Sequence, residues 1–152
     1  KLPASGKLDD KTYRTLAEEA YRKQAPAGVQ GRDVVAAAAA LKGVRYRYGG
    51  TAPDKGFDCS GYVSYVFAKY KVALPRTADR QYEQGLFVLR QALRAGDLVF
   101  FTTGEPGPSH VGIYAANGAF WHASSSRGVM LSRLDDVYWK SRYIGARRLL
   151  LE

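Results

Sequence analysis

The sequence predicts one α+β domain in which helices pack on a central antiparallel β-sheet. Helical periodicity is confined to the first half of the chain, whereas short segments rich in β-branched and aromatic residues fill the second half. Helices followed by strands are typical of α+β domains with an antiparallel sheet. The chain has 152 residues, of which 46% are hydrophobic, and this is enough for one packed domain and a short appendage.

The appendage is predicted at the N-terminus. Residues 1–24 have the pattern of a helix entered through a polar turn, with an apolar stripe of Tyr13, Leu16, Ala17 and Ala20. Proline and glycine interrupt residues 24–31, which indicates a linker. We therefore divide the chain into an N-terminal segment, residues 1–31, and a main domain, residues 32–152.

Two longer helices are expected in the first half of the main domain. An alanine-rich helix over residues 33–41 is capped by Asp33. A second helix begins at Asp58 or Cys59 and ends near Tyr70, with apolar residues at i, i+4, i+7 and i+11. Cys59 lies on this apolar stripe but in the first turn of the helix.

The second half of the chain is predicted to form strands. A short helix near residues 78–84 comes first. Segments rich in β-branched and aromatic residues, separated by glycine or asparagine, then follow one another. The predicted strands are residues 96–102, 110–115, 119–124, 129–133 and 143–151.

Charge and hydropathy limit the classes of partner. The formal net charge is +9, which favours nucleic acid, an anionic membrane surface or an acidic cell-wall polymer without choosing among them. The chain lacks a basic helix or an aromatic-basic motif, so nucleic acid is not expected. The longest apolar run, residues 34–41, is far shorter than the roughly 20 residues that span a bilayer. Because the sequence starts at Lys1 rather than at Met, the lack of a secretory signal says little about export.

Cys59 is the only cysteine, which excludes an intramolecular disulfide. A lone cysteine is ordinarily a small buried hydrophobe. It becomes a nucleophile as a thiolate, which a helix N-terminus and a nearby imidazole both favour. Cys59 has the first feature by its position, and the two histidines of the chain, His110 and His122, both fall in the strand half.

The two histidines come together in only one register of their strands. A three-residue loop over residues 116–118 places Ala115 opposite Ala119 and makes His110 and His122 diagonal neighbours on one face. A two-residue Asn-Gly loop puts them on opposite faces. The catalytic interpretation therefore requires the longer loop. His110 then takes the thiol proton, and His122 orients the ring of His110.

Spacing alone leaves two other interpretations open. Either histidine by itself is more often a hydrogen-bonded structural residue than a catalyst. Cys59, His110 and His122 are also ligand types that bind zinc, but no fourth ligand stands at a typical spacing, so we expect no metal.

Several segments together resemble the NlpC-type cell-wall peptidases, which are papain-like cysteine peptidases. The most specific is Gly56-Phe57-Asp58-Cys59-Ser60-Gly61, which is similar to their glycine-hydrophobic-Asp-Cys-Ser-Gly signature. The others are Tyr46-Arg47-Tyr48-Gly49-Gly50, Leu74-Pro75-Arg76-Thr77-Ala78, the run from Ala95 to Phe101, His110-Val111-Gly112-Ile113-Tyr114, His122-Ala123-Ser124, and the ending from Tyr138-Trp139 to Arg148. They follow one another in the family's order, and the chain looks most like the Spr-type murein endopeptidases.

The resemblance implies a papain-like NlpC-type fold and a role for each member of a Cys-His-His set. Cys59 matches the nucleophile, His110 the base and His122 the third polar residue. Tyr46 matches a tyrosine whose hydroxyl lies near the nucleophile and helps to stabilise the oxyanion. Backbone N–H groups at the start of the helix are expected to contribute as well.

The resemblance also assigns substrate contacts to three residues. Asp58 and Ser60 match positions that contact the substrate peptide in related enzymes, and Arg76 matches a position that allows contact with a stem-peptide carboxylate. An ordinary helix N-cap is the alternative for Asp58. A structural ion pair is the alternative for Arg76.

The implied function is a peptidoglycan endopeptidase that works without a cofactor. It hydrolyses amide bonds in murein stem peptides or cross-links, near D-glutamate or meso-diaminopimelate, through an acyl-thioenzyme. We expect a monomer in the cell envelope or outside the cell, exported by an N-terminal segment absent from this chain. Residues 2–13 are weakly similar to the tail of a peptidoglycan-binding repeat, so residues 1–31 are either the remnant of an upstream binding domain or a helix packed on the catalytic domain, and we favour the second. The alternatives are a non-catalytic wall-binding module and a thiol amidase or acyltransferase that acts on another substrate.

Overall fold

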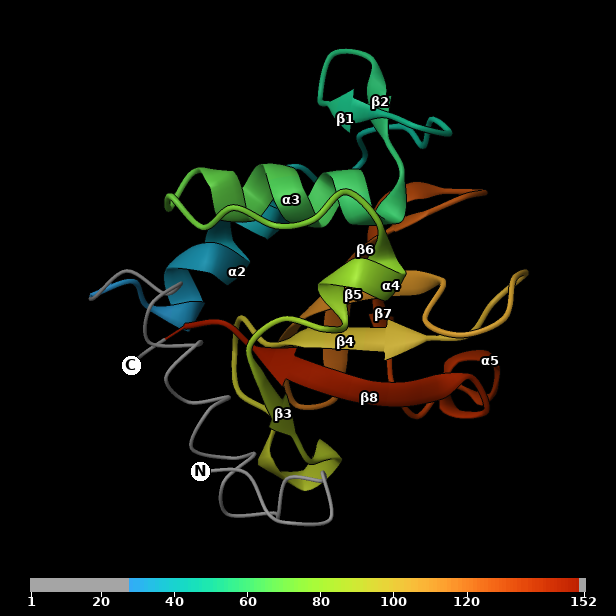
Figure 1. The fold of residues 1–152 in the computed structure, drawn as a ribbon. Helices are drawn as coiled ribbons and strands as arrows, with labels where there is room; N and C mark the ends of the chain where they lie inside the picture. Colours follow the sequence, from blue (N-terminus) through green and yellow to red (C-terminus); the bar gives the residue numbers. More distant parts are fainter. Residues whose placement is uncertain (1–27, 151–152) are drawn as a thin grey trace, which may run out of the picture.

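The computed structural model of this protein describes residues 28–150. The helix predicted within residues 1–24 and the first part of the linker, residues 25–27, lie outside the described residues. The described helices include α2 (Gly31–Ala39), α3 (Cys59–Ala68) and α4 (Ala78–Gln81), shown in Figure 1. Within residues 28–150, no helix is long and apolar enough to cross a bilayer.

A six-stranded sheet forms the centre of the domain, with strand order β3-β8-β4-β5-β6-β7. Its strands are β3 (Leu86–Val88), β4 (Leu98–Phe101), β5 (His110–Ala116), β6 (Ala119–Ser124), β7 (Gly128–Arg133) and β8 (Tyr143–Arg148). Every neighbouring pair in this sheet is antiparallel. The predicted α+β class, with helices on an antiparallel sheet, is therefore confirmed.

Both faces of the sheet are covered, as the central strand β4 shows. All four of its residues are buried. Leu98 and Phe100 belong to the hydrophobic cluster that includes α2 and α3, whereas Val99 and Phe101 belong to a second cluster. Because side chains alternate along a strand, these two clusters lie on opposite faces. The short helix α5 (Val137–Lys140) contributes Trp139 to the second cluster.

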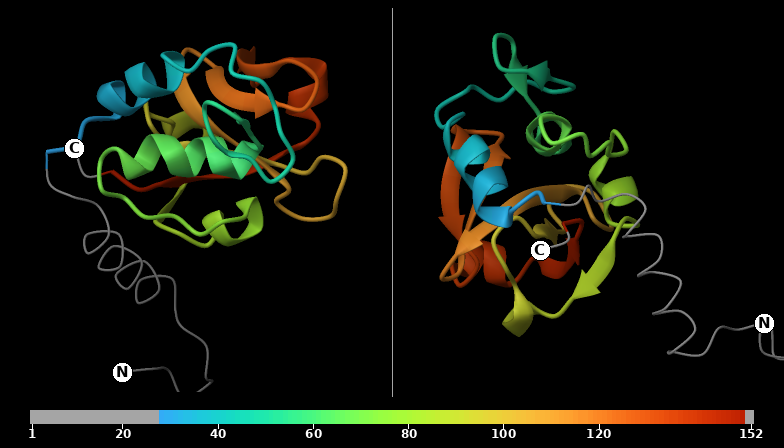
Figure 2. Two further views of the ribbon diagram at one scale, coloured as in Figure 1. Left: turned by 90° about the horizontal axis from the view of Figure 1, so that it is seen from above. Right: turned by 90° about the vertical axis from the view of Figure 1, so that its left-hand side faces the viewer.

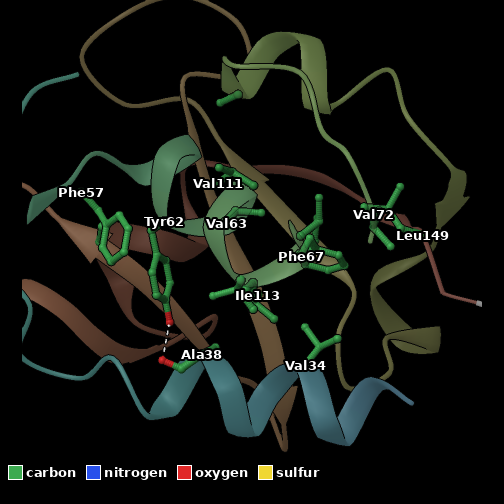
Figure 3. Close-up of a cluster of buried hydrophobic side chains, with 14 of the residues drawn as sticks. Val34, Ala38, Phe57, Tyr62, Val63, Phe67, Val72, Val111, Ile113 and Leu149 are labelled. Atoms are coloured by element: carbon green, nitrogen blue, oxygen red, sulfur yellow. Dashed lines mark hydrogen bonds between the residues drawn. The ribbon is translucent and has the colours of Figure 1, made fainter. Parts of the chain in front are cut away.

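The first cluster holds α3 on the sheet. Figure 3 shows Val34 and Ala38 of α2, Tyr62, Val63 and Phe67 of α3, and Val111 and Ile113 of β5 packed in this buried cluster. The Tyr62 hydroxyl donates a hydrogen bond to the Ala38 carbonyl oxygen at 2.8 Å, so the polar atom that Tyr62 brings into the core is paired. Burying each large apolar side chain of this kind contributes roughly 1.5–3 kcal/mol. This packing fixes the position of the residue that begins α3, Cys59.

The structure corrects the start of the first predicted helix. Helix α2 begins at Gly31, and its N-cap is Gln30, which makes no capping hydrogen bond through its side chain. Asp33 is not the cap but lies in the first turn. In the first turn, the negative charge of Asp33 interacts favourably with the positive end of the helix dipole. An aspartate near a helix start is therefore expected at this position as well as at the N-cap.

The remaining predicted elements are present, some of them with shorter ends, and five short elements were missed. Helix α3 ends at Ala68 rather than near Tyr70, and the last strand ends at Arg148. The elements missed are β1 (Thr51–Ala52), β2 (Gly56–Phe57), β3, the 3-10 helix η1 (Arg90–Ala92) and α5. Strands β1 and β2 form a small hairpin that projects beyond α3 on the side away from the sheet (Figures 1 and 2). Segments of two to four residues are too short for a detectable periodicity.

The connection between β5 and β6 differs from the predicted three-residue loop. Ala116 pairs with Ala119, so the loop is the two-residue turn Asn117-Gly118, with φ angles of 51° and 82°. Asn-Gly suits a turn that needs positive φ at both positions. The register then shifts between Tyr114 and Ala116, which is a β-bulge. The bulge pairs Tyr114 with Phe120, which is the register that the longer loop was expected to produce.

Candidate active site

Hydrogen bonds fix the first turn of α3 around Cys59. Asp58 is the N-cap, and its Oδ1 accepts a hydrogen bond from the Gly61 N–H at 2.7 Å. The N–H of Asp58 donates to the Gly50 carbonyl oxygen at 3.1 Å. A Cβ atom on Gly61 would collide with that oxygen, so the close approach of loop and helix requires glycine here. The predicted start of the helix is confirmed.

Cys59 is half-buried, and its Sγ lies 3.8 Å from the Ser109 carbonyl oxygen. Burial raises the pKa of the thiol, and the charge of Asp58 acts in the same direction. The backbone N–H groups of Val111, Ser60 and Cys59 act against them by favouring the thiolate. The helix N-terminus therefore does not ionise Cys59 by itself, and a base has to take its proton.

The two histidines are in direct contact. The Nε2 atom of His110, in β5, lies 2.9 Å from the Nδ1 atom of His122, in β6. Burial lowers the pKa of His110 to about 4. Burial, followed by the charge of His110, lowers the pKa of His122 to about 3. Both rings are therefore neutral at pH 7, the form in which an imidazole acts as a base.

An aromatic cluster surrounds the two imidazole rings. Trp139 stacks on His110 with ring centroids 5.1 Å apart and contacts His122 edge-on at 4.9 Å. Phe101 packs against His110, and Phe120 packs against His122. These rings bury most of both imidazoles, which explains why burial dominates their pKa values.

Tyr46 reaches Cys59 from the loop that precedes the β1–β2 hairpin. It forms an isolated β-bridge to Phe57, and the N–H of Arg47 donates to the Phe57 carbonyl oxygen at 2.9 Å. Burial raises the pKa of Tyr46, and a charge on Cys59 raises it further. The phenol therefore keeps its proton and can donate a hydrogen bond to an oxyanion.

The three predicted binding residues form one cluster beside Cys59. Arg76 contacts the Asp58 carboxylate through two nitrogens, at 2.8 and 3.1 Å, and the Ser60 hydroxyl at 3.0 Å. The structural ion pair considered for Arg76 is thus present, as is the N-cap considered for Asp58. The Arg76 side chain nevertheless remains 44% exposed, so it can also contact a ligand.

Cys59 lies where two clefts meet. The charged cleft, of about 590 Å³, is lined by the cluster of Asp58, Ser60 and Arg76 and by the loop that includes Glu105. The serine cleft, of about 380 Å³, is lined by His110, Trp139 and three consecutive serines, Ser124, Ser125 and Ser126. Cys59 and Tyr46 line both clefts. A peptide that occupies both clefts therefore passes the thiol.

All seven predicted site residues are brought together. Cys59, His110 and Tyr46 share the serine cleft, His122 is bonded to His110, and the remaining three line the charged cleft. Among residues 28–150, no three His, Cys, Asp or Glu side chains are grouped as metal ligands.

Sequence reasoning missed two residues of the site. Trp139 had no signal beyond its place in the matched Tyr-Trp pair. Ser132, in β7, has its Oγ atom 2.8 Å from the Nε2 atom of His122. The predicted pairing of β6 with β7 could have identified Ser132. Ser132 pairs with Phe120, and Phe120 lies on the same face of β6 as His122.

The capping role of Asp58 leads to a stability prediction. We expect Asp58→Ala to lower the free energy of unfolding by about 1–2 kcal/mol, because the Gly61 N–H loses its acceptor. Asp58→Asn keeps a capping oxygen, so its loss should be clearly smaller, although the ion pair with Arg76 is broken. Urea unfolding measures both values. Equal losses in the two variants would show that the cap is not the stabilising feature.

Comparison with known proteins adds a family assignment to this geometry. The sequence profile of the NlpC/P60 family matches residues 43–148. The Escherichia coli K12 protein named "Murein DD-endopeptidase MepS/Murein LD-carboxypeptidase" is 51% identical over 110 residues, which are 72% of this chain and 57% of that protein. The "Probable endopeptidase NlpC" of the same organism is 39% identical over 147 residues, which are 91% of this chain and 95% of that protein.

A solved structure agrees with the fold. The crystal structure of an NlpC/P60 family protein from Bacillus cereus superposes with a TM-score of 0.75 at 29% identity, covering 81% of this chain and 41% of that one. This chain spans only about half the length of the first of the relatives that it matches. Residues 43–148, which the family profile matches, nevertheless contain every residue of the candidate site.

Proposed function

Since this chain belongs to the NlpC/P60 family, we propose that it is a peptidoglycan endopeptidase that hydrolyses amide bonds of murein peptides. One observation carries the proposal. Cys59 begins a helix in a cleft that also contains His110, and His110 is hydrogen-bonded to His122 at 2.9 Å. A papain-like acyl transfer needs these three groups, namely a nucleophile, a base and a residue that orients the base.

The reaction begins when His110 removes the proton of Cys59. Burial disfavours a lone thiolate and a lone imidazolium. The proton transfer creates both charges together, so each stabilises the other. Sulfur then attacks the carbonyl carbon of the substrate, and the Tyr46 hydroxyl and the backbone N–H groups at the start of α3 stabilise the resulting oxyanion.

The tetrahedral intermediate breaks down when the C–N bond breaks and His110 donates its proton to the leaving amine. A thioester then joins Cys59 to the acyl part of the peptide. His110 next removes a proton from water, which attacks the thioester carbon. The S–C bond breaks, the acid product leaves and Cys59 regains its proton from His110.

We assign a stem-peptide carboxylate to the charged cleft. Arg76 is 44% exposed despite its pairing with Asp58, and the Ser60 hydroxyl lies 3.0 Å from its guanidinium. A guanidinium beside a hydroxyl matches a carboxylate in charge and hydrogen bonding. Murein peptides carry carboxylates at D-glutamate and at meso-diaminopimelate, so the proposed target is an amide bond next to one of these residues.

This substrate places the protein in the cell envelope or outside the cell. Peptidoglycan lies beyond the cytoplasmic membrane, so a protein that acts on it has to be exported. The net charge of +9 favours association with an anionic wall. We propose that the protein acts on the wall as a monomer, because one chain supplies the whole catalytic set.

The function is tested by digestion of purified sacculi and muropeptides, with products identified by mass spectrometry. We expect the protein to release new peptide fragments and Cys59→Ala to release none. Because Cys59 is the only cysteine, one equivalent of iodoacetamide should label this residue and abolish the activity. The proposal is wrong if the protein releases no fragment, or if Cys59→Ala releases as much as the wild type.

The same digestion separates the two alternatives. A non-catalytic wall-binding module would sediment with sacculi and leave the muropeptides intact. A thiol acyltransferase would attach an added amine, such as glycine amide, to the acyl fragment, and the product mass would show this directly. Hydrolysis instead adds the elements of water at the broken bond.

A further inference from the structure

The hydrogen-bonded chain at the histidines continues beyond His122. His110 Nε2 lies 2.9 Å from His122 Nδ1, and His122 Nε2 lies 2.8 Å from Ser132 Oγ. The other nitrogen of His110, Nδ1, has no hydrogen-bond partner in the structure within residues 28–150. Of the two ring nitrogens of His110, Nδ1 is therefore the one available to Cys59.

A neutral imidazole carries one N–H, so two arrangements of protons satisfy these distances. In the first, His110 Nε2–H donates to His122 Nδ1, and His122 Nε2–H donates to Ser132. In the second, the Ser132 hydroxyl donates to His122 Nε2, and His122 Nδ1–H donates to His110 Nε2. The first leaves a lone pair on His110 Nδ1, whereas the second places a proton there.

Only the first arrangement suits the proposed catalysis, because a protonated Nδ1 cannot accept the proton of Cys59. In the first, the hydroxyl hydrogen of half-buried Ser132 can turn to solvent. In the second, water in the serine cleft, which His110 lines, can pair with the Nδ1–H of His110, because Nδ1 is not among the buried side-chain atoms without a partner within residues 28–150. Both arrangements are therefore satisfied, and the acceptor that the thiol of Cys59 needs selects the first.

We propose that Ser132 is a positioning residue that supports the catalytic tautomer of both histidines. By accepting a hydrogen bond from His122 Nε2, it holds both rings with the proton on Nε2 and leaves His110 Nδ1 free to take the thiol proton. Ser132 acts through His122 and lines neither cleft. This role rests on the proposed function for its use in catalysis, whereas the tautomers exist without any substrate.

Nitrogen-15 NMR of histidine-labelled protein tests the proposal directly. The chain contains two histidines, so a sample without a histidine tag has four ring nitrogens to assign. At pH 7 we expect Nε2 of both rings to be protonated and Nδ1 of both rings to be unprotonated. A protonated Nδ1 on His110 would overturn the proposal, whether or not the protein hydrolyses peptidoglycan.

A pair of variants of equal shape tests the hydroxyl itself. Ser132→Thr keeps the oxygen and Ser132→Val removes it, and both β-branched residues suit a strand. We expect Ser132→Val to lower kcat about three- to tenfold at unchanged KM, which is the effect of losing one neutral hydrogen bond. In this variant, part of the His110 population should carry a proton on Nδ1. Ser132→Thr should retain kcat and the wild-type spectrum.

The rate at which iodoacetamide alkylates Cys59 provides a readout that needs no murein substrate. It should fall in Ser132→Val in parallel with kcat, because both depend on the lone pair of His110. Equal kcat, alkylation rate and nitrogen spectra in the Val and Thr variants would overturn the role of Ser132. If only murein hydrolysis is absent in the wild-type protein, the proposed function fails and the tautomer assignment stands.

Discussion

Replacement of His110 by glutamine is expected to lower kcat for murein peptides by roughly a thousandfold, within the range that general-base catalysis contributes. Burial raises the pKa of Cys59, so little thiolate exists at pH 7 unless a base takes the proton. Glutamine is similar in size and forms hydrogen bonds, but it cannot accept a proton at this pH. Alkylation of Cys59 by iodoacetamide should slow as well.

The matched control for this prediction is His122→Asn. An asparagine oxygen can accept the hydrogen bond that His110 Nε2 donates, so the ring of His110 stays oriented. We expect a loss of only about ten- to a hundredfold, because the base itself is retained. Comparable losses in the two variants, or a His110→Gln protein with more than a tenth of the wild-type kcat, would contradict the assignment of His110 as the base.

Local sequence signals predicted the nucleophile side of the site well. The cap, the helix start and the position of Cys59 in the first turn all depend on neighbours within a few residues. Asp58 and Gly61 make their hydrogen bond within a single turn. Such contacts depend on backbone geometry within one turn, so the local residue types predict them.

The histidine side shows how a prediction can reach the right register through the wrong turn. His110 and His122 share one face only if the connection between β5 and β6 contains one residue more than a two-residue turn allows. From the sequence, this residue is predicted in the loop. The chain instead uses the tight turn Asn117-Gly118 and places the additional residue in a bulge before Ala116. An Asn-Gly pair favours a two-residue turn. Only the pairing of the complete strands shows that a bulge is also needed.

The contact of Trp139 with His110 was beyond local reasoning. Trp139 lies in a four-residue helix and stacks on a residue nearly thirty positions earlier in the chain. No periodicity marks such a short helix, and the contact arises only when α5 folds onto the second face of the sheet. The low pKa of His110 depends on this packing, so its neutral state was not predictable from the sequence either.

The buried histidines should also make the fold sensitive to acid. The pKa values of His110 and His122 fall from 6.5 to about 4 and about 3 on folding, because burial disfavours the imidazolium. Below pH 6.5 the unfolded chain therefore binds two protons that the folded chain does not. Stability is full above pH 6.5 and decreases as the pH falls toward 4, by about 2–3 kcal/mol per pH unit between pH 5.5 and 4.5.

Urea unfolding from pH 8 to pH 4.5 measures this loss, and His122→Asn shows where it comes from. Removal of one titrating imidazole should reduce the slope of the free energy of unfolding against pH by about half, whatever its effect on stability at pH 8. Asp97 acts in the opposite sense, because burial raises its pKa and protonation then favours the folded state. Its contribution is common to both proteins and cancels in the difference of their slopes. An unchanged slope in His122→Asn would show that the acid sensitivity arises elsewhere.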